Sequence, residues 1–309
     1  MSSRRQFIQS SLATAAAGVS ISSAHGQASG EWKPLFDGKT LEGWKKVPRI
    51  YVHNAIGDAK APEAIEAAIK KTLDWHRSQN SELHRHLGDW KVVDGAIIGG
   101  QDPPRSRMGA YLMTEEEYGD FELEYEMRPD WRTDTGVLVR QHKAGTIGFQ
   151  VLCDHRPGGG IGGFFTNGLG SYLAAPVVVD GDVGENFKVE NLREGTSKSK
   201  FPHANVSDAA TYEQFRRVWN VNGWNRFRVR CVGANPVLTA WVNDLKIGTL
   251  DSSEPGVNGY DPAIIEQRVG SRGHIGLEVH SNGPRNGWNQ WAKGAVSRWR
   301  NIRVKELGA

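Results

Sequence analysis

The chain has 309 residues, of which 24% are charged and 38% hydrophobic, and its formal net charge at pH 7 is +3. This length and composition suit one large globular domain, with or without an insertion. The small net charge argues against nucleic acid or an anionic membrane as a partner.

The first residues have the pattern of an export signal. The pair Arg4-Arg5 precedes an alanine-rich apolar run at Leu12–Ile21, and Ala24–Gly26 offers the small residues that a signal peptidase needs. We therefore expect residues 1–26 to be a twin-arginine export signal, and residues 27–309 to be one periplasmic or cell-surface domain. No later apolar stretch is long enough to span a bilayer, so no membrane span is expected once the signal is removed.

A helix is predicted at residues 62–77. Pro62 stands at its start, and Ile65 and Ile69 recur at helical spacing. The helix is expected to lie on a surrounding β-structure, within a helical insertion at about residues 55–88.

Most of the remaining chain alternates apolar and polar residues at every second position, as a strand with one buried face does. The alternating segments are residues 121–128, 137–140, 149–154, 226–231, 238–243 and 275–280. Asp94-Gly95 between two short apolar runs is typical of a tight hairpin. Many strands with one polar face predict an all-β fold, an antiparallel β-sandwich. Residues 155–222 are rich in glycine and irregular, so we expect a long loop that covers the polar face.

The two cysteines, Cys153 and Cys231, each lie on the apolar side of a predicted strand. An oxidising compartment would permit a disulfide between them, and burial as two free thiols is the other outcome. Neither cysteine has the neighbours of a zinc site or of a cysteine nucleophile.

Several phrases in order resemble a known family. They are Leu35–Trp44 (LFDGKTLEGW), Asp120–Leu123, Gly136–Arg140, Gly276–His280 and Trp299–Val304. The chain, from about residue 32 to 307, resembles the 3-keto-disaccharide hydrolase family, once catalogued as domain of unknown function 1080. The resemblance implies a concanavalin A-like jelly roll of two antiparallel sheets. It also implies cleavage of glycosides whose C3 hydroxyl has been oxidised to a ketone.

The implied chemistry sets requirements for the site. A ketone at C3 makes the hydrogen on C2 acidic, so a base can remove it and the resulting enolate can expel the C1 oxygen. Water later adds back, and the net result is hydrolysis. Such a site needs a general base, a proton donor to the leaving oxygen and groups that stabilise the enolate. No cofactor is evident from the sequence, and a divalent metal ion is compatible with it.

Glu278 and His280 lie one step apart on the polar face of a strand. An imidazole titrates near neutral pH, so it can both take and return a proton. The resemblance implies that His280 belongs to the family pattern, which more often has glutamine where Glu278 stands. We predict His280 and Glu278 as catalytic residues, and a solvated strand end without function is the alternative.

Arg140 ends another strand and is predicted as a third catalytic residue, which would bind the keto oxygen or sugar hydroxyls. A surface arginine paired with Glu122 or Glu126 is the alternative. We expect the side chains of His280, Arg140 and Gln150 to converge in one cleft on the concave sheet.

Gln150 and Asp154 share one face of the next strand and are predicted to bind substrate. The resemblance implies a glutamate, a glutamine and an aspartate on that face, where this chain has Gln150, Leu152 and Asp154. The lost acid leaves open another base, another substrate or no catalysis. Asp154 could orient the substrate, ligate a metal, or cap the turn before Pro157.

Two other functions are compatible with the sequence. Glu122, Glu124 and Glu126 on one strand face resemble the acid pair of a retaining glucanase, and Glu126 is a candidate substrate-binding residue. The same face could instead be an outward acidic surface that arginines neutralise. Trp288 and Trp291 follow His280 in a loop, where flat rings would suit a sugar face in a substrate site or in a noncatalytic glycan-binding module. Core packing is the alternative for each tryptophan.

Overall fold

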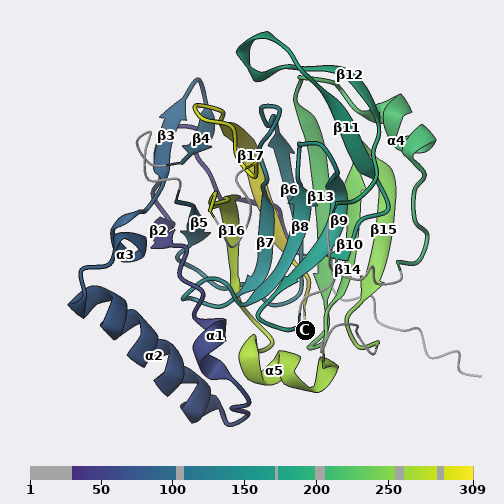
Figure 1. Cartoon of the computed structure of the whole chain (residues 1–309). Coiled ribbons are helices and arrows are strands. Elements are labelled where there is room, and N and C mark those ends of the chain that lie inside the picture. Colours follow the sequence, from purple (N-terminus) through teal and green to yellow (C-terminus); the bar gives the residue numbers. More distant parts are fainter. Residues whose placement is uncertain are drawn as a thin grey trace, which may run out of the picture.

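The computed structural model describes residues 30–101, 108–170, 173–198, 206–254, 261–283 and 289–308. These residues form two antiparallel sheets packed face to face, so the predicted all-β sandwich is confirmed (Figure 1). The export signal expected at residues 1–26 lies outside the described residues. Within the described ranges, no helix combines the length and the apolar character that crossing a membrane requires.

One sheet has eight strands and the other nine within the described residues. The eight-stranded sheet runs in the order β15 (Leu245–Asp251), β14 (Val237–Val242), β13 (Asn225–Val232), β6 (Phe121–Met127), β17 (Ser297–Glu306), β4 (Ala96–Gly100) and β3 (Asp89–Val93), with β1 (Lys33–Pro34) paired to β17. The nine-stranded sheet runs β12 (Val189–Glu194), β11 (Val178–Val183), β9 (Gly159–Asn167), β8 (Gly148–Cys153), β7 (Gly136–Gln141), β16 (His274–Val279), β5 (Ala110–Thr114) and β2 (Trp44–Pro48), with β10 (Leu173–Ala174) paired to β9.

The core lies between the two inner faces, and the alternating residues fill it. In β6 every second residue is buried and the glutamates between them are partly exposed. Across the sheet, the ring of Tyr125 stacks on Phe227 with their centroids 5.2 Å apart. Cys153 and Cys231 are both buried in this core as free thiols, so the structure contains no disulfide between them. A buried thiol packs there as a small apolar group.

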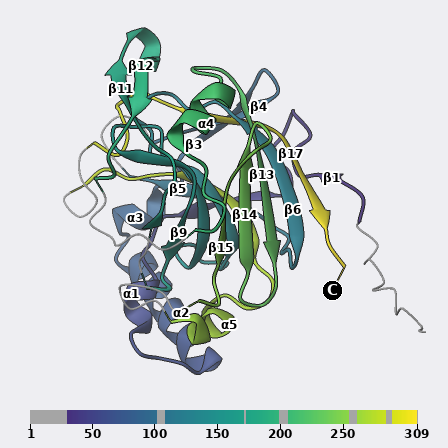
Figure 2. The same cartoon turned by 90° about the vertical axis from the view of Figure 1, so that its right-hand side faces the viewer.

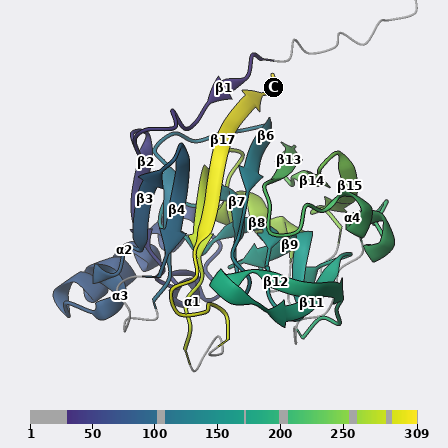
Figure 3. The same ribbon diagram turned by 90° about the horizontal axis from the view of Figure 1, so that it is seen from above.

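The predicted hairpin and helix are both present. Asp94 and Gly95 adopt φ of 50° and 73° between β3 and β4, as a two-residue turn of primed type requires. Figure 3 shows β17 in the middle of this sheet, between β4 and β6. Helix α2 (Pro62–Ser78) buries Ile65 and Ile69.

The remaining helices are short. They are α1 (His53–Ile56), α3 (Glu82–Arg85), α4 (Tyr212–Val218), α5 (Ile265–Arg268) and the 3₁₀ turns η1 (Glu185–Phe187) and η2 (Pro262–Ile264). Figure 2 shows α1, α2 and α5 gathered at one end of the sandwich.

The expectation of an irregular loop at residues 155–222 is wrong, because this segment contains β9, β10, β11, β12 and α4. Its glycines allow close backbone neighbours inside a sheet. A Cβ at Gly163 would lie 2.3 Å from the carbonyl oxygen of Ala174, and one at Gly159 would lie 2.1 Å from that of Asp154. The glycine-rich run therefore extends the nine-stranded sheet beyond β8, and glycine here marks close approach of strands.

Arg140 does not reach the polar outer face of its sheet, which corrects its predicted role as a catalytic residue that binds the keto oxygen or sugar hydroxyls. The pairing of β16 with β7 shifts register between His274 and Gly276, and Arg140 adopts a φ of 50° at this irregularity. Such a bulge re-aims a side chain. The fully buried guanidinium donates to carbonyl oxygens of Gly119 at 3.1 Å and Gly233 at 3.1 Å.

The guanidinium of Arg140 also lies 2.9 Å from Oδ1 of Asp120. Asp120 stands just before β6, and Gly233 just after β13. Both strands belong to the eight-stranded sheet, so Arg140 joins the two sheets at one end of the sandwich.

Arg140→Met should therefore act on stability. Removing the fully buried guanidinium leaves its carbonyl partners and Asp120, which is 28% exposed, without their donor, so the free energy of unfolding should fall by about 3 kcal/mol. Urea denaturation measures this change. The matched control is Arg303→Met, which breaks an exposed ion pair and should change stability by about 1 kcal/mol or less. Equal losses in the two variants would contradict the assignment of Arg140 as a link between the sheets.

Candidate functional site

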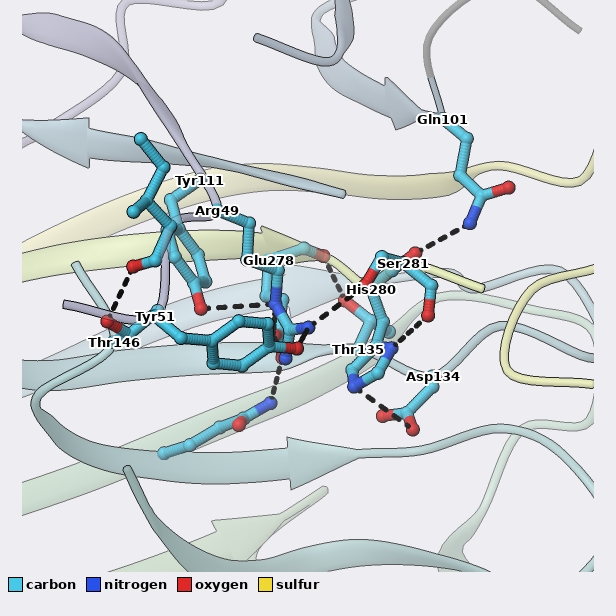
Figure 4. Close-up of polar contacts among 12 residues, drawn as sticks. Arg49, Tyr51, Gln101, Tyr111, Asp134, Thr135, Thr146, Glu278, His280 and Ser281 are labelled. Atoms are coloured by element: carbon cyan, nitrogen blue, oxygen red, sulfur yellow. Dashed lines mark hydrogen bonds and ion pairs between the residues drawn. The ribbon is translucent and has the colours of Figure 1, made fainter. Parts of the chain in front are cut away.

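The candidate site lies on the outer face of the nine-stranded sheet, where β16 ends. Ile275, Leu277 and Val279 point into the core, so Glu278 between them points outward. Glu278 stands opposite Tyr111 of β5 in the pairing of β16 with that strand. Figure 4 shows the side chains of Glu278 and Tyr111 together with Arg49.

Arg49 is the centre of the polar contacts around Glu278. Its Nε donates to Oε1 of Glu278 at 3.1 Å and to the hydroxyl of Tyr111 at 3.1 Å, and its Nη2 lies 3.0 Å from the same carboxylate oxygen. Nη1 donates to Oγ of Ser281 at 3.2 Å and to the hydroxyl of Tyr51. The side chains of Arg49 and Glu278 are only 6% and 1% exposed, so the pair is held away from bulk water.

Gln150 approaches Glu278 from β8. Its Nε2 donates a hydrogen bond to Oε2 of Glu278. Gly136 of β7 lies between them, and a Cβ there would come within 2.8 Å of Nε2 of Gln150, so glycine leaves room for this contact. The pair thus contains one amide and one carboxylate. The acid that the resemblance implies at position 150 is absent, and the carboxylate that contacts this position belongs to Glu278.

The environment of Glu278 brings its proton exchange close to neutral pH. Burial raises the pKa of its carboxyl to about 7. The charge of Asp134 acts in the same direction, whereas Arg49 and Gln150 favour the carboxylate and lower the pKa.

His280 carries a defined tautomer. Its Nδ1 lies 2.7 Å from the carbonyl oxygen of Ser281, which can only accept, so the proton sits on Nδ1 and the lone pair on Nε2. Nε2 points toward Oδ2 of Asp134 at 4.0 Å (Figure 4). Burial and the charge of Arg49 lower the pKa of His280 to about 4, so the imidazole is neutral at neutral pH. Gln101 holds the backbone by donating to the carbonyl oxygen of His280 at 2.7 Å.

Two aspartates share the guanidinium of Arg156 beside His280. Nη2 of Arg156 donates to Oδ2 of Asp134 at 2.9 Å, and Nε lies 2.7 Å from Oδ1 of Asp154. Burial opposes ionisation of Asp134, but His280 and Arg156 outweigh it and lower its pKa. Burial, with Asp134 and Glu278 nearby, raises the pKa of Asp154 well above its usual value. The two carboxyls are therefore driven toward opposite protonation states.

The structure brings together four of the predicted residues, which are His280, Glu278, Gln150 and Asp154. Trp291 is not among them, because it is 2% exposed in the core and its indole donates to the carbonyl oxygen of Ala295 at 2.8 Å. Its predicted substrate contact is therefore wrong. Trp288 lies outside the described residues.

Glu126 lies on the other sheet, so its predicted place in this site is also wrong. Its Oε2 is 2.6 Å from Nε of Arg300, and Glu122 and Glu124 likewise have basic partners on β17. The glucanase interpretation is thus replaced by its alternative, an outward acidic row neutralised by neighbouring strands.

Sequence reasoning missed Arg49, Asp134 and Arg156. Arg49 follows a short strand and Asp134 precedes one, and neither has a periodic pattern around it. Their importance comes from contacts across the fold, such as the 3.0 Å between Arg49 and Glu278. Within the part of the chain that the structure describes, no three His, Cys, Asp or Glu side chains are grouped so that they could hold a metal ion.

Comparison with known proteins gives a family and similar structures. The model of a family described as 3-keto-alpha-glucoside-1,2-lyase-like domain matches residues 31–305. A candidate glycosyl hydrolase from Parabacteroides distasonis ATCC 8503 is 18% identical with a TM-score of 0.45, and the match covers 90% of this chain and 100% of the other. A second one from that organism is 14% identical with a TM-score of 0.44, covering 90% and 94%. The carbohydrate-binding module CBM66 from Bacillus subtilis is 14% identical with a TM-score of 0.39, covering 71% and 92%. No curated protein matches this chain.

Glu278→Gln should change how stability depends on pH. The folded chain keeps the proton of Glu278 up to a pKa of about 7, whereas the unfolded chain releases it near 4.5. Between these values the folded state binds more protons, so Glu278 lowers the free energy of unfolding as the pH rises. The difference, variant minus parent, should therefore rise between pH 4.5 and 7 by about 3 kcal/mol. Urea denaturation at a series of pH values measures it.

His280→Asn provides a control of opposite sign. The pKa of His280 is about 4 in the folded chain against its ordinary 6.5, so between these values the unfolded state binds more protons. His280 makes stability rise with pH there, and the difference, variant minus parent, should fall over that range. Two flat difference curves would show that neither group is buried as described.

Proposed function

Because the chain belongs to the 3-keto-alpha-glucoside-1,2-lyase-like family, we propose that it cleaves the glycosidic bond of 3-keto glycosides. A base removes the C2 proton, and the C2–H electrons form an enolate with the C3 ketone. As the enolate collapses, the C1–O bond breaks and a C1–C2 double bond forms. Water then adds its oxygen to C1 and a proton returns to C2, so the net result is hydrolysis.

The observation that carries this proposal is the free lone pair on Nε2 of His280. The imidazole is neutral, and its Nδ1–H is held by the carbonyl oxygen of Ser281. It can therefore accept a proton only at Nε2. Asp134, 4.0 Å away, would then stabilise the imidazolium that forms. The side chain of His280 is 14% exposed and that of Glu278 only 1%, so a substrate reaches His280 first.

The neighbours of His280 supply the other two groups that the reaction needs. Arg156 is a cation at the rim of the site, with 19% of its side chain exposed, and would stabilise the enolate oxygen. Asp154 has a raised pKa, so it is suited to give a proton to the departing C1 oxygen. The buried Arg49, Glu278 and Gln150 would then form the floor that holds β16 and its end in place.

We further propose that the protein works outside the cytoplasm, on the basis of the twin-arginine pattern in residues 1–26. Replacing both Arg4 and Arg5 by lysine should leave the precursor in the cytoplasm. Fractionation of cells that express the tagged parent and variant measures this, and unchanged export of the variant would overturn it.

His280→Asn should keep binding and lose turnover. Asparagine retains hydrogen bonding but cannot take a proton, so kcat should fall by roughly a hundredfold to ten-thousandfold. The assay compares a 3-keto-disaccharide with its unoxidised parent sugar. Deuterium at C2 of the keto substrate should slow the parent enzyme. Release of sugar from the unoxidised disaccharide alone, or turnover of the variant at the parent rate, would overturn the mechanism.

Exchange of the acid and the amide between positions 150 and 278 tests whether activity needs only one carboxylate in this pair, at either position. Glu278→Gln leaves two amides beside Arg49, and Gln150→Glu brings two carboxylates together, so each single variant should lose kcat/KM. The double variant restores one acid and one amide and should recover activity, with a coupling of roughly 0.5–3 kcal/mol. Additive losses in the double variant would show that the carboxylate must stand on β16.

A further inference from the structure

A second charged surface lies on the outer face of the eight-stranded sheet, away from the candidate site. Its middle row is Glu122, Glu124 and Glu126 on β6, which runs between β13 and β17. Each glutamate has one basic residue beside it on each neighbouring strand. These six basic residues are Arg226, Arg228 and Arg230 on β13, and Arg300, Arg303 and Lys305 on β17. We call this surface the basic ladder.

The basic ladder has twice as many cations as anions. Glu124, for example, stands opposite Arg228 on one side and Arg303 on the other. Only one of these cations takes it as an ion-pair partner, since Nη2 of Arg303 lies 2.5 Å from its Oε2. Arg228 makes no ion pair within the described residues. Arg226 also pairs with Asp244, which lies between β14 and β15, so the six cations meet four carboxylates and this face keeps an excess of positive charge.

Aromatic rings hold the arginines of the basic ladder flat. The guanidinium of Arg228 lies 4.1 Å from the ring centroid of Trp241, and that of Arg300 lies 4.2 Å from Trp224. Arg303 lies 4.7 Å from the ring of Trp32. All three tryptophans are partly exposed. Cation–π contacts of this kind fix the direction of a guanidinium while its donors still reach solvent.

The fold gains little from this arrangement. The ion pair of Arg230 with Glu122 at 3.4 Å leaves 48% of the arginine side chain exposed, and such pairs contribute about 0–1 kcal/mol. Arg226, Arg228 and Arg230 point the same way at every second position, about 6.5–7 Å apart, and repel one another. Oriented, repelling cations are instead suited to a partner that brings regularly spaced anions.

We propose that the basic ladder binds an acidic polysaccharide, with its sulfate or carboxylate groups on the two basic rows and its sugar rings against the tryptophans. The rows supply charge complementarity, and the exposed parts of the rings suit the apolar faces of sugars. The ladder lies on the opposite sheet from His280, so binding here is independent of the proposed reaction. It would hold the protein on an acidic glycan while the other sheet stays accessible.

The test uses the full chain, with heparin as a sulfated polysaccharide and dextran as a neutral one. Arg228→Gln combined with Arg303→Gln should weaken heparin binding by about tenfold or more. The control, Lys60→Gln combined with Lys71→Gln, removes the same charge from exposed positions at the helical insertion and should change the Kd less than about twofold. Circular dichroism and turnover should match the parent in both double variants.

Three outcomes would overturn the proposal. Equal weakening in the two double variants would show that heparin binding depends on the total charge of the protein and not on the basic ladder. Dextran binding as tight as heparin binding would show that the tryptophans bind sugar without any contribution from the basic rows. Binding to anionic lipid vesicles but not to heparin would assign the surface to a membrane.

Discussion

The ion pair between Arg49 and Glu278 is the constraint on which the outer face of the nine-stranded sheet depends. A charge with almost no exposure is strongly destabilising unless its partners satisfy it, and losing one partner of such a pair exposes the full cost of burying the other. Arg49 stands after β2, Tyr111 lies on β5 and Glu278 on β16, so the pair joins three neighbouring strands. The interaction therefore holds Glu278 in place next to the last residue of β16, two residues before His280.

The same arrangement explains how similar carboxyls come to have different properties. Glu278, Asp134 and Asp154 lie in one buried network, yet Asp134 keeps a low pKa while burial raises those of the other two. Burial raises the pKa of both aspartates, so the difference comes from their neighbours. His280 and Arg156 lower the pKa of Asp134, whereas Asp154 has only Arg156 and is opposed by Asp134 and Glu278. A site that must both remove and return protons needs such a division of protonation states.

The sequence predicts periodic features well, because they are local. The alternation of β6, the turn at Asp94-Gly95 and the helix from Pro62 all follow from side-chain period and turn chemistry, and the structure confirms each. Arg140 shows where this reasoning ends. Strict alternation places it on the outer face, and one irregularity in the pairing of β16 with β7 sends it between the sheets. Such an irregularity depends on the partner strand, which a single segment does not reveal.

The candidate site is non-local in the same sense. His280 and Gln150 could be selected from their strands, but Asp134 and Arg156 acquire a role only when β7, β8 and the end of β16 meet. The contrast with Glu126 shows which physical property decides. Glu126 has an equally clear strand position and an arginine at 2.6 Å, yet it lies at the solvent surface, where an ion pair changes little. On the nine-stranded sheet, the arginine–glutamate pair of Arg49 and Glu278 is buried. Burial there makes the pair part of a fixed network whose protonation depends on pH. The chemical role of a residue in this fold therefore follows from how deeply it is buried and from the partners that it shares. Residue type and position in the strand alternation identify only the candidates.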